Sequence, residues 1–410
     1  MDIRKMVIIG GGATGLCTAI SVARLGIQVV VLEHNSRLGK KISVSGNGKC
    51  NITNSSISID KFHSTDNSFV EEFLVGYSFS AIKNFFSSIG LELIEGEGGR
   101  IYPMSMQASS VVEIMEYEAQ RLGVEIVCDC EVSDIAVSDG IFMVDTDTKR
   151  YSSSMLLIAS GSIAAPQLGG SDVGYRFADS LKHHYVTNHP SLVQLTSSDK
   201  WVERVAGVKI YAEVELYANG MKVSHKRGDV LFTKYGISGL AVLDISREVS
   251  MRMAEYEYCE LSIDLLPHYS KEKLAKLLLD RIDSQSQKSI SLWLHGVLHK
   301  KLIPIVLEQS KVKISTESGL NRKEINRLVH SIKNIKLSID GTRGWSGAEV
   351  ATGGVDVSEV DPYTMESKIV PNLFWGGEVL DVDGDRGGFN LHFAWSCGIK
   401  IGRYLKSITT

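Results

Sequence analysis

The chain has 410 residues. A single hydrophobic core rarely serves a chain of this length, so we predict two domains or one domain with an insertion. Its composition, 43% hydrophobic and 22% charged, is that of a soluble globular protein. The formal net charge of −4 gives no case for nucleic acid or an anionic membrane surface as a partner. No stretch reaches the ~18 uninterrupted apolar residues of a membrane helix. We therefore expect a cytoplasmic protein; its oligomeric state stays open.

The six cysteines are scattered along the chain, and no two have the C-x-x-C spacing of a redox or zinc site. This pattern favours reduced thiols and predicts no metal site.

The first recognisable unit is a strand, a glycine turn, a helix and a second strand. The strand Met6–Ile9 is followed by Gly10, Gly12 and Gly15, which have the G-x-G-x-x-G spacing. In that pattern the first glycine allows the tight turn, the second admits a pyrophosphate to the backbone, and the third lets helix and strand pack closely. Glu33 ends the second strand, where a carboxylate can accept hydrogen bonds from the ribose of an adenosine. These features together predict a dinucleotide site.

The segment 34–54 is dense in Gly, Ser and Asn and carries three lysines, which predicts a long loop. Such a loop beside a dinucleotide site can hold phosphate or cover a cofactor ring. The alternative is an Ω-loop on the surface without a ligand.

The middle of the first domain is expected to alternate helices and strands. The pattern predicts a helix over 69–89, a hairpin over 91–103, a helix over 109–122, a strand over 124–128, a β-meander over 131–144 and a strand over 151–158. That last strand ends in Ala159, Ser160 and Gly161, small residues that bring the backbone close to a ligand.

The sequence pattern changes near residue 190, from glycine-rich loops to alternating strand patterns, and residues 191–345 are predicted to form an inserted domain. Its β-rich part covers about 191–260, with strict alternation over 208–216 and returning strands at 221–224 and 230–233. Its helical part covers about 268–335 and includes a helix over 271–282, Pro304 as the first residue of another helix, and a capping box of Asn321 and Glu324.

The last segment returns to glycine-rich loops. A short strand, Leu373–Trp375, precedes a polar turn, and a run of glycines then opens the final helix. A helix N-terminus of this kind attracts a phosphate or the oxygen of a flavin ring. Gly387, Gly388 and Asn390 open this helix, and Asp381 in the turn before it can accept hydrogen bonds from a polyol such as ribityl. The alternative is an ordinary glycine turn before a C-terminal helix.

The motifs together resemble the HI0933-like, or aminoacetone-oxidase-like, bacterial family of FAD-dependent flavoproteins. The resemblance rests on K-K-I-S-V-S-G-N-G-K-C-N-I-T-N at 40–54, G-R-I-Y-P at 99–103, L-F-T-K-Y-G-I-S-G at 231–239, T-G-G-V at 352–355, T-M-E-S-K at 364–368, G-E-V-L-D-V-D-G at 377–384 and G-G-F-N-L at 387–391. The chain departs from the family pattern in two places. It has Ala159-Ser160-Gly161-Ser162 where the family usually has Ala-Thr-Gly-Gly, and it has Leu240 where the family usually has proline after S-G.

The resemblance implies an α/β fold: a three-layer Rossmann-type domain for FAD, formed by 1–190 and 346–410 and interrupted by an insert with a β-barrel-like and a helical part. FAD would be bound non-covalently, and Val132 would contact adenine through its backbone. The complete set of expected cofactor contacts is Gly10, Gly12, Ala13, Thr14, Gly15, Glu33, His34, Lys40, Lys41, Gly46, Asn47, Gly48, Cys50, Asn51, Val132, Ala159, Ser160, Gly161, Gly377, Glu378, Asp381, Gly387, Gly388, Asn390 and Leu391.

The expected activity is that of a flavin-dependent oxidoreductase, in which the cofactor carries the chemistry. We expect a small organic substrate between the FAD domain and the insert, and transient binding of NAD(P)H as a donor. The candidates for acid–base roles are His392, Arg386, Tyr102 and Arg100; the alternatives are a surface histidine, solvated arginines and a packing tyrosine. Cys50 is expected beside the flavin, as a packing residue or a modulator of its potential.

Two questions stay open from the sequence. Relatives oxidise amines or reduce conjugated enones, so the direction of electron flow is undetermined. A non-catalytic, flavin-binding regulatory protein is the alternative function, because no acid–base pair is evident.

Overall fold

A computed structural model describes residues 5–284, 289–312 and 320–409. The chain divides into two compact units: unit 1 comprises Met1–His189 and Val350–Thr410, and unit 2 comprises Pro190–Glu349. Each unit has its own hydrophobic core. Within the described ranges, no helix has both the length and the apolar composition required to span a bilayer.

The core of unit 1 is a five-stranded parallel sheet. Its strands, in order across the sheet, are β21 (Leu373–Trp375), β11 (Met155–Ile158), β1 (Lys5–Ile9), β2 (Gln28–Leu32) and β7 (Glu125–Val127). Met6, Val7 and Ile8 of the central strand are fully buried, which agrees with an apolar run covered on both faces. The α/β fold with a Rossmann-type parallel sheet, expected from the sequence, is confirmed.

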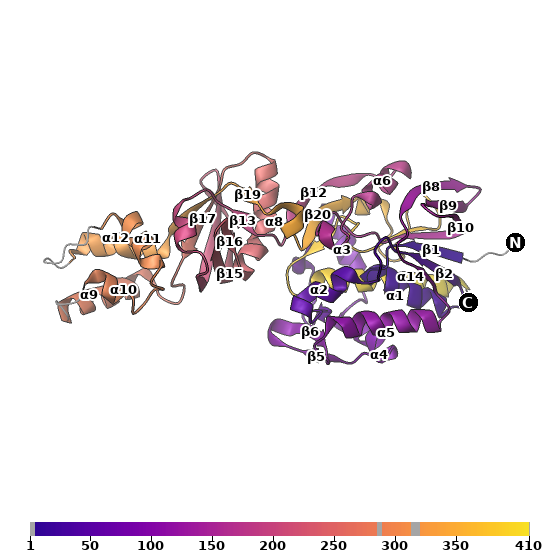
Figure 1. The fold of residues 1–410 in the computed structure, drawn as a ribbon, viewed down its shortest axis with the longest axis horizontal. Coiled ribbons are helices and arrows are strands. Elements are labelled where there is room, and N and C mark those ends of the chain that lie inside the picture. The colour runs from indigo at the N-terminus through magenta and orange to yellow at the C-terminus, as the bar shows by residue number, and fades with distance from the viewer. Residues whose placement is uncertain (1–4, 285–288, 313–319, 410) are drawn as a thin grey trace. The chain divides into compact units, whose positions relative to one another are not determined.

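Two layers cover this sheet (Figure 1). On one side lie α1 (Ala13–Ala23), α5 (Ala108–Arg121) and α14 (Phe389–Thr409); on the other lies an antiparallel meander of β8 (Val132–Ser138), β9 (Ile141–Thr146) and β10 (Arg150–Ser153). Helices α1 and α14 approach closely because α14 presents glycines to α1. A Cβ on Gly402 would lie 2.4 Å from Ser21 Cβ, and one on Gly398 would lie 2.7 Å from Cys17 Cβ. This contact fixes the start of α14 beside the start of α1.

Three expectations for unit 1 were wrong in detail. The helix expected over 69–89 is two helices, α3 (Asn67–Leu74) and α4 (Phe79–Ser88), separated by a turn in which Gly76 has a φ of +74°. The loop expected over 34–54 contains α2 (Lys40–Gly48), whose backbone leaves helical geometry at Ser45–Asn47. The strand expected over 151–158 is split between the antiparallel β10 and the parallel β11.

The remaining elements of unit 1 are short. They are β3 (Thr53–Asn54), η1 (Ile59–Lys61), β4 (Phe62–His63), β5 (Leu93–Glu95), η2 (Glu97–Gly99), β6 (Arg100–Pro103), η3 (Pro166–Leu168), α6 (Val173–Ser180), β12 (Tyr185–Ser191), β20 (Val350–Val355), η4 (Val357–Glu359) and β22 (Asp383–Gly384). The expected hairpin at 91–103 is present as β5 and β6.

Unit 2 begins with a seven-stranded antiparallel sheet. In order, its strands are β18 (Ile335–Ile339), β17 (Cys259–Asp264), β14 (Lys209–Ala218), β15 (Met221–Thr233), β16 (Gly236–Ser238), β13 (Leu195–Thr196) and β19 (Gly341–Thr342). The two strands expected at 221–224 and 230–233 form one continuous strand. The helices α7 (Trp201–Arg204), α8 (Leu240–Ala254) and α13 (Gly344–Gly347) accompany the sheet.

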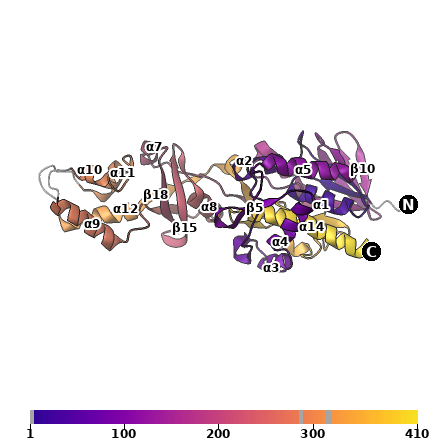
Figure 2. The same cartoon turned by 90° about the horizontal axis from the view of Figure 1, so that it is seen from below.

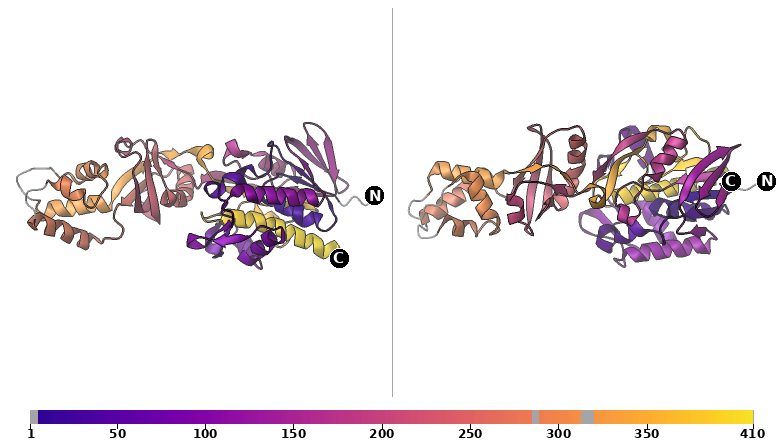
Figure 3. Two further views of the ribbon diagram at one scale, coloured as in Figure 1. Left: turned by 60° about the horizontal axis from the view of Figure 1, so that its bottom comes forward. Right: turned by 45° about the horizontal axis from the view of Figure 1, so that its top comes forward.

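Four helices complete unit 2: α9 (Lys271–Ser284), α10 (Ile290–Leu294), α11 (Leu302–Ser310) and α12 (Arg322–Lys333). Figure 2 shows them gathered in one group, and the views of Figure 3 agree. The predicted capping box is confirmed, since Asn321 accepts from Glu324 N at 3.0 Å and Glu324 accepts from Asn321 N at 2.9 Å. Pro304 is the third residue of α11 and not the first, but its missing N–H is still one that the helix would leave unpaired.

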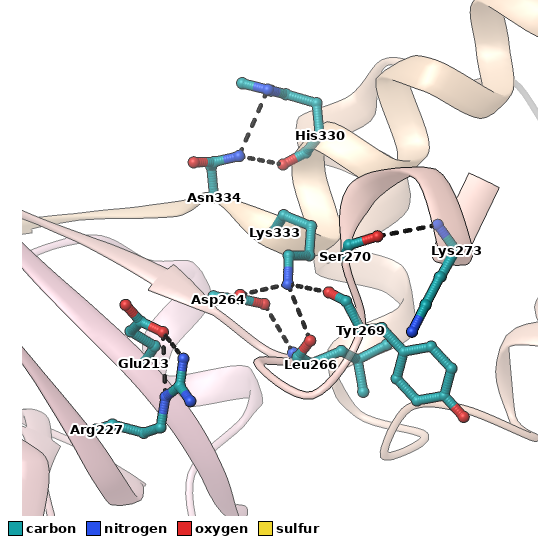
Figure 4. Close-up of polar contacts among 10 residues, drawn as sticks. All are labelled: Glu213, Arg227, Asp264, Leu266, Tyr269, Ser270, Lys273, His330, Lys333 and Asn334. Carbon is teal, nitrogen blue, oxygen red and sulfur yellow. Dashed lines mark hydrogen bonds and ion pairs between the residues drawn. The ribbon is translucent and has the colours of Figure 1, made fainter.

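Lys333 joins the helices to the sheet of unit 2. Its Nζ lies 2.5 Å from Asp264 Oδ2 and donates to the carbonyls of Leu266 and Tyr269 at 2.9 and 2.5 Å (Figure 4). The side chain is only 9% exposed, and three acceptors match the three N–H donors of its ammonium group.

Candidate cofactor site

The three fingerprint glycines differ in what surrounds them, and the differences match three separate roles. Gly10 has a φ of +103°, and a Cβ there would lie 2.3 Å from the carbonyl oxygen of Ala159. A Cβ on Gly15 would lie 1.9 Å from the carbonyl oxygen of Gly10. At Gly12, in contrast, a Cβ would meet no described atom within 4 Å. Gly10 and Gly15 are therefore required by the turn itself, whereas Gly12 faces open space beside the N-terminus of α1.

Glu33 lies at the end of β2 and orders the turn around it. Its Oε2 accepts from Gly11 N at 2.8 Å, and its Oε1 accepts from Asn35 N at 2.8 Å and Asn35 Nδ2 at 2.7 Å. Burial by itself raises the pKa of Glu33, but hydrogen bonds from His34, Asn35 and Gly11 outweigh it and hold the pKa below its usual value. The carboxylate stays ionised, and Oε2 keeps a lone pair for a further donor.

The loop that was expected to hold phosphate supplies a cation next to the C-terminal glycine turn. Lys41 Nζ, on α2, lies 2.5 Å from Glu378 Oε2, and Ser162 Oγ donates to the same oxygen at 3.3 Å. About a third of the Lys41 side chain is exposed, so the pair is accessible from outside. Three segments that are far apart in sequence therefore meet here.

The N-terminus of α14 is held by β3. Asn54 Nδ2 donates to the Gly387 carbonyl at 3.0 Å, and a Cβ on Gly388 would lie 2.5 Å from the Thr53 carbonyl. The side chain of Asn390 is used structurally, since it both accepts from Gly384 N at 2.8 Å and donates to Gly384 O at 2.7 Å. These contacts hold the start of the 21-residue α14 beside β3, so the free N–H groups of its first turn have a defined place in unit 1.

Two buried polar atoms test whether the site suits FAD. Asn51 Oδ1 and Ser160 Oγ are buried, and no described residue hydrogen-bonds to either. Unpartnered buried groups are costly, and both lie in the segments expected to contact the cofactor. Together with the open side of Gly12 and the ionised Glu33, they fit a ligand that carries a pyrophosphate, a ribose and a polar ring.

The other expected contacts take several positions. Ala13 and Thr14 begin α1, and Thr14 Oγ1 donates to Ala394 O at 2.9 Å. The His34 ring lies 3.2 Å from the Glu33 carboxylate. Lys40 Nζ donates to Asn35 Oδ1 at 3.1 Å. Val132 begins β8, and Leu391 lies in the first turn of α14. Gly46, Asn47 and Gly48 form the bend in α2, and Gly161 and Gly377 both have positive φ.

Asp381 and Cys50 are more enclosed than expected. Asp381 is 2% exposed, and its Oδ2 accepts from Thr65 N at 2.9 Å and from Thr65 Oγ1 at 2.5 Å. Cys50 is fully buried, and burial raises the pKa of its thiol to about 12. Both side chains are therefore enclosed by protein. Which of the two roles Cys50 has beside the flavin stays a prediction.

His392 does not lie on a helix surface, and it is not accessible. It is fully buried within α14; its Nδ1 is 2.8 Å from Thr53 Oγ1 and its Nε2 is 2.9 Å from the Tyr77 carbonyl. Burial lowers the pKa of His392 to about 4, so the ring is neutral. Because both nitrogens are occupied and no surface is open, this histidine positions β3 and α14 and does not contact a substrate.

The other catalytic candidates are half-buried. Arg100 and Tyr102 lie on β6, with the Tyr102 ring 3.7 Å from the position of a Cβ on Gly46, and Arg386 directly precedes Gly387. Sequence reasoning missed Thr53, Asn54 and Thr65. The signal for the first two was the N-I-T-N run at 51–54, in which Thr53 and Asn54 are buried and Asn54 holds the glycine turn before α14. No pattern pointed to Thr65.

Comparisons with known proteins agree with this architecture. The family model of the HI0933-like protein Rossmann domain matches residues 4–404. The chain is 35% identical over 399 residues to a 3-dehydro-bile acid delta(4,6)-reductase of Clostridium scindens, covering 97% of each chain. It is 31% identical over 407 residues to a ribosomal RNA dihydrouridine synthase of Haemophilus influenzae, covering 97% of this chain and 98% of that one.

Solved structures share the fold at lower identity. A 3-ketosteroid delta1-dehydrogenase from Sterolibacterium denitrificans superimposes with a TM-score of 0.53 at 10% identity, over 99% of this chain and 100% of that chain. At that identity the likeness concerns the fold alone. The family match spans nearly the whole sequence, and the chain belongs to the HI0933-like family of FAD-dependent, Rossmann-domain oxidoreductases.

Proposed function

We propose that the chain reduces a carbon–carbon double bond conjugated to a carbonyl group, using FAD held in unit 1. The observation that carries the proposal is a set of features within unit 1: the open side of Gly12 at the start of α1, the ionised Glu33 after β2, and the buried, unpartnered atoms of Asn51 and Ser160. These features suit a bound dinucleotide, and the open side of Gly12 and the two unpartnered atoms have no partner among the described residues.

The reaction class comes from what two relatives of nearly full length have in common. One is named for reducing delta(4,6) unsaturation in a 3-dehydro bile acid, and the other for forming dihydrouridine in ribosomal RNA. In a 3-oxo steroid with 4,6 unsaturation, and in uracil, the double bond is conjugated to a carbonyl. Each product has two more hydrogens than its substrate. We infer that this chain also acts in the reducing direction.

Bound FAD would supply a ring that exchanges a hydride. The residues of the chain hold and shield it. The N-terminus of α1 and Gly12 would hold the pyrophosphate, and the Glu33 carboxylate would accept a hydrogen bond from a ribose hydroxyl. The N-terminus of α14 provides a positive dipole end for negative charge on the ring. Tyr102 and Arg100 remain the candidates for placing a proton on the substrate, since His392 is enclosed.

NAD(P)H is the proposed electron donor, bound transiently because the chain has a single complete dinucleotide fingerprint. The expected place of the substrate, between the FAD domain and the insert, stays a prediction.

A single-turnover experiment tests the proposal. Holoprotein reduced anaerobically with dithionite is mixed with a 4-ene-3-ketosteroid, a 4,6-diene-3-ketosteroid or a uridine-containing RNA, and products are analysed by mass spectrometry. The proposal predicts return of the oxidised flavin spectrum and a substrate that gains two hydrogens. A reduced flavin that no conjugated carbonyl compound reoxidises would favour the alternative of a non-catalytic flavin-binding regulator.

A further inference from the structure

A histidine and a carboxylate that are 322 positions apart in the sequence form a close pair in unit 1. His63 Nε2 lies 2.9 Å from Asp385 Oδ1, and the two side chains are 33% and 24% exposed. Because an ionised carboxylate can only accept hydrogen bonds, Nε2 carries the hydrogen of this contact. The other ring nitrogen, Nδ1, has no hydrogen-bond partner among the described residues. The pair thus combines an orienting carboxylate on one nitrogen with a second nitrogen that is unoccupied in a partly exposed ring.

The backbone and the neighbouring side chains fix the position of His63. Strands β4 and β22 pair in antiparallel orientation, and Asp385 N donates to the Lys61 carbonyl at 2.8 Å. Two residues after His63, Thr65 donates to Asp381 from its backbone N at 2.9 Å. The segment 63–65 therefore binds two carboxylates of the turn that precedes α14. A side chain fixed in this way loses little freedom when a substrate binds beside it.

The pair adjoins the start of α14, where the cofactor ring is expected. The residue before His63, Phe62, packs edge-on against Phe389 at the start of α14, with ring centres 5.8 Å apart. The unpartnered Oδ1 of Asn51 lies at the same turn, since a Cβ on Gly388 would be 3.0 Å from it. A buried acceptor without a partner and an oriented histidine therefore border one glycine turn of unit 1.

The other candidates for an acid each lack part of this arrangement. Both nitrogens of His392 are occupied inside the protein. The side chains of Tyr102 and Arg100 make no hydrogen bond to a described carboxylate, and a guanidinium donates hydrogen bonds without giving up its proton. His184 does have a carboxylate partner, Glu359 at 2.6 Å, but its side chain is 83% exposed. Of these side chains, His63 joins an orienting carboxylate to partial burial.

We propose that His63 is the acid that protonates the substrate, and that Asp385 positions its ring. The inference rests on the proposed function, in which a conjugated double bond gains two hydrogens. One hydrogen arrives as a hydride with its electron pair, which is the chemistry that bound FAD supplies. The other arrives as a proton on the carbon next to the carbonyl group: the Nδ1–H bond of the imidazolium breaks as this C–H bond forms. The neutral imidazole keeps its Nε2–H on Asp385 and takes a new proton from water at its exposed edge.

The first experiment separates protonation from electron transfer. Holoprotein is reduced anaerobically with one equivalent of dithionite and mixed in a stopped-flow spectrometer with 2-cyclohexenone or a 4,6-diene-3-ketosteroid. A parallel sample is mixed with ferricyanide, which takes electrons without forming a C–H bond. General acids contribute about 10²- to 10⁴-fold in rate, so His63→Gln should slow reoxidation by the enones at least about a hundredfold. Reoxidation by ferricyanide, the affinity for FAD and the thermal midpoint should stay at their wild-type values.

The matched control is His184→Gln, which removes the ring of a histidine–carboxylate pair on the surface of the same unit and should change neither rate. Asp385→Asn should slow the enone step in the wild-type background but add little to the loss in His63→Gln, because the carboxylate acts through the ring. Imidazole in solution should restore part of the enone rate to His63→Ala. Additive losses and no rescue by imidazole would contradict the role of the pair as an acid and its positioning carboxylate.

A second experiment measures contact with the substrate without turnover. The oxidised holoprotein is treated with diethyl pyrocarbonate, with and without a saturating concentration of whichever of the two enones reoxidises the wild type. Peptide mass spectrometry then reports the modification of each histidine. We expect His63 to be modified in the free protein and protected by the enone, and His184 to be modified in both samples.

The outcomes distinguish this inference from the proposed function. Enone reduction by His63→Gln at the wild-type rate, or equal modification of His63 with and without the enone, would refute the role of His63 and leave the proposed function standing. A wild-type protein that ferricyanide reoxidises but neither enone nor any other conjugated carbonyl compound reoxidises would refute the proposed function, and the role of His63 with it.

Discussion

Lys400 offers a test of the packing of α14 against the rest of unit 1. Its side chain is 1% exposed, and its ammonium lies 4.0 Å from the centre of the Tyr77 ring and 4.8 Å from that of Phe73. Burial lowers the pKa of Lys400 from 10.5 to about 8, with Arg403 lowering it further and Cys397 and Asp361 raising it. Lys400→Met keeps the volume and removes the charge.

The magnitude follows from the shift in pKa. The unfolded chain binds the proton more tightly than the native state, so stability rises with pH between about 8 and 10.5. Below pH 8 both states are protonated, and the full penalty, about 3 kcal/mol, is present. The cation–π contacts offset part of it. Lys400→Met should therefore raise the free energy of unfolding by about 1–2 kcal/mol near pH 7, and the gain should shrink as the pH approaches about 10.5.

Equilibrium urea denaturation followed by tryptophan fluorescence, at pH values on both sides of this window, measures the effect. Lys406→Met, on the exposed face of the same helix, is the control and should show no comparable dependence on pH. A Lys400→Met protein that is destabilised equally at all pH values would refute the reasoning, because it would show that the charged ammonium stabilises the fold.

Three further predictions concern five substitutions. Gly12→Ala should change the free energy of unfolding by no more than about 0.5 kcal/mol, because a Cβ there meets no described atom, yet it should lower the affinity for FAD at least about tenfold. Gly15→Ala should instead unfold the turn, because a Cβ there would overlap the Gly10 carbonyl. Thermal scans with and without FAD distinguish the two results. Lys333→Met should lower the free energy of unfolding, measured in urea, by about 2–4 kcal/mol, because it leaves a carboxylate and two carbonyls unpaired. The control Lys323→Met should lower it by less than about 0.5 kcal/mol. Similar losses in the two variants would contradict the structural role of Lys333. Cys50→Ala should not change the flavin potential or turnover, and native Cys50 should resist alkylating reagents; a shifted potential would return Cys50 to the cofactor.

Local rules predicted the parts of the fold that local residues decide. The capping box of Asn321 and Glu324 needs only two side chains three positions apart, and it is present as expected. The fingerprint glycines likewise follow from the geometry of one turn. The helix expected over 69–89 failed because its apolar residues continue through Gly76, where the chain adopts a positive φ and turns.

The long-range contacts of the site could not be predicted in the same way. The sequence offered His392 as an acid–base candidate or as a surface histidine, because nothing local shows that Thr53 and the Tyr77 carbonyl enclose it. Similarly, the ion pair of Lys41 and Glu378 joins residues 337 positions apart. Such contacts depend on how the sheet and α14 assemble, so a sequence pattern can name the participants but not their partners.

The central claim is that unit 1 holds FAD for reduction of a conjugated double bond. The most direct test is the anaerobic absorbance spectrum of the purified protein, recorded before and after NADH or NADPH and again after a conjugated carbonyl substrate. The account predicts oxidised-flavin bands that one donor bleaches and the substrate restores. A protein without flavin, even after reconstitution with FAD, would contradict it.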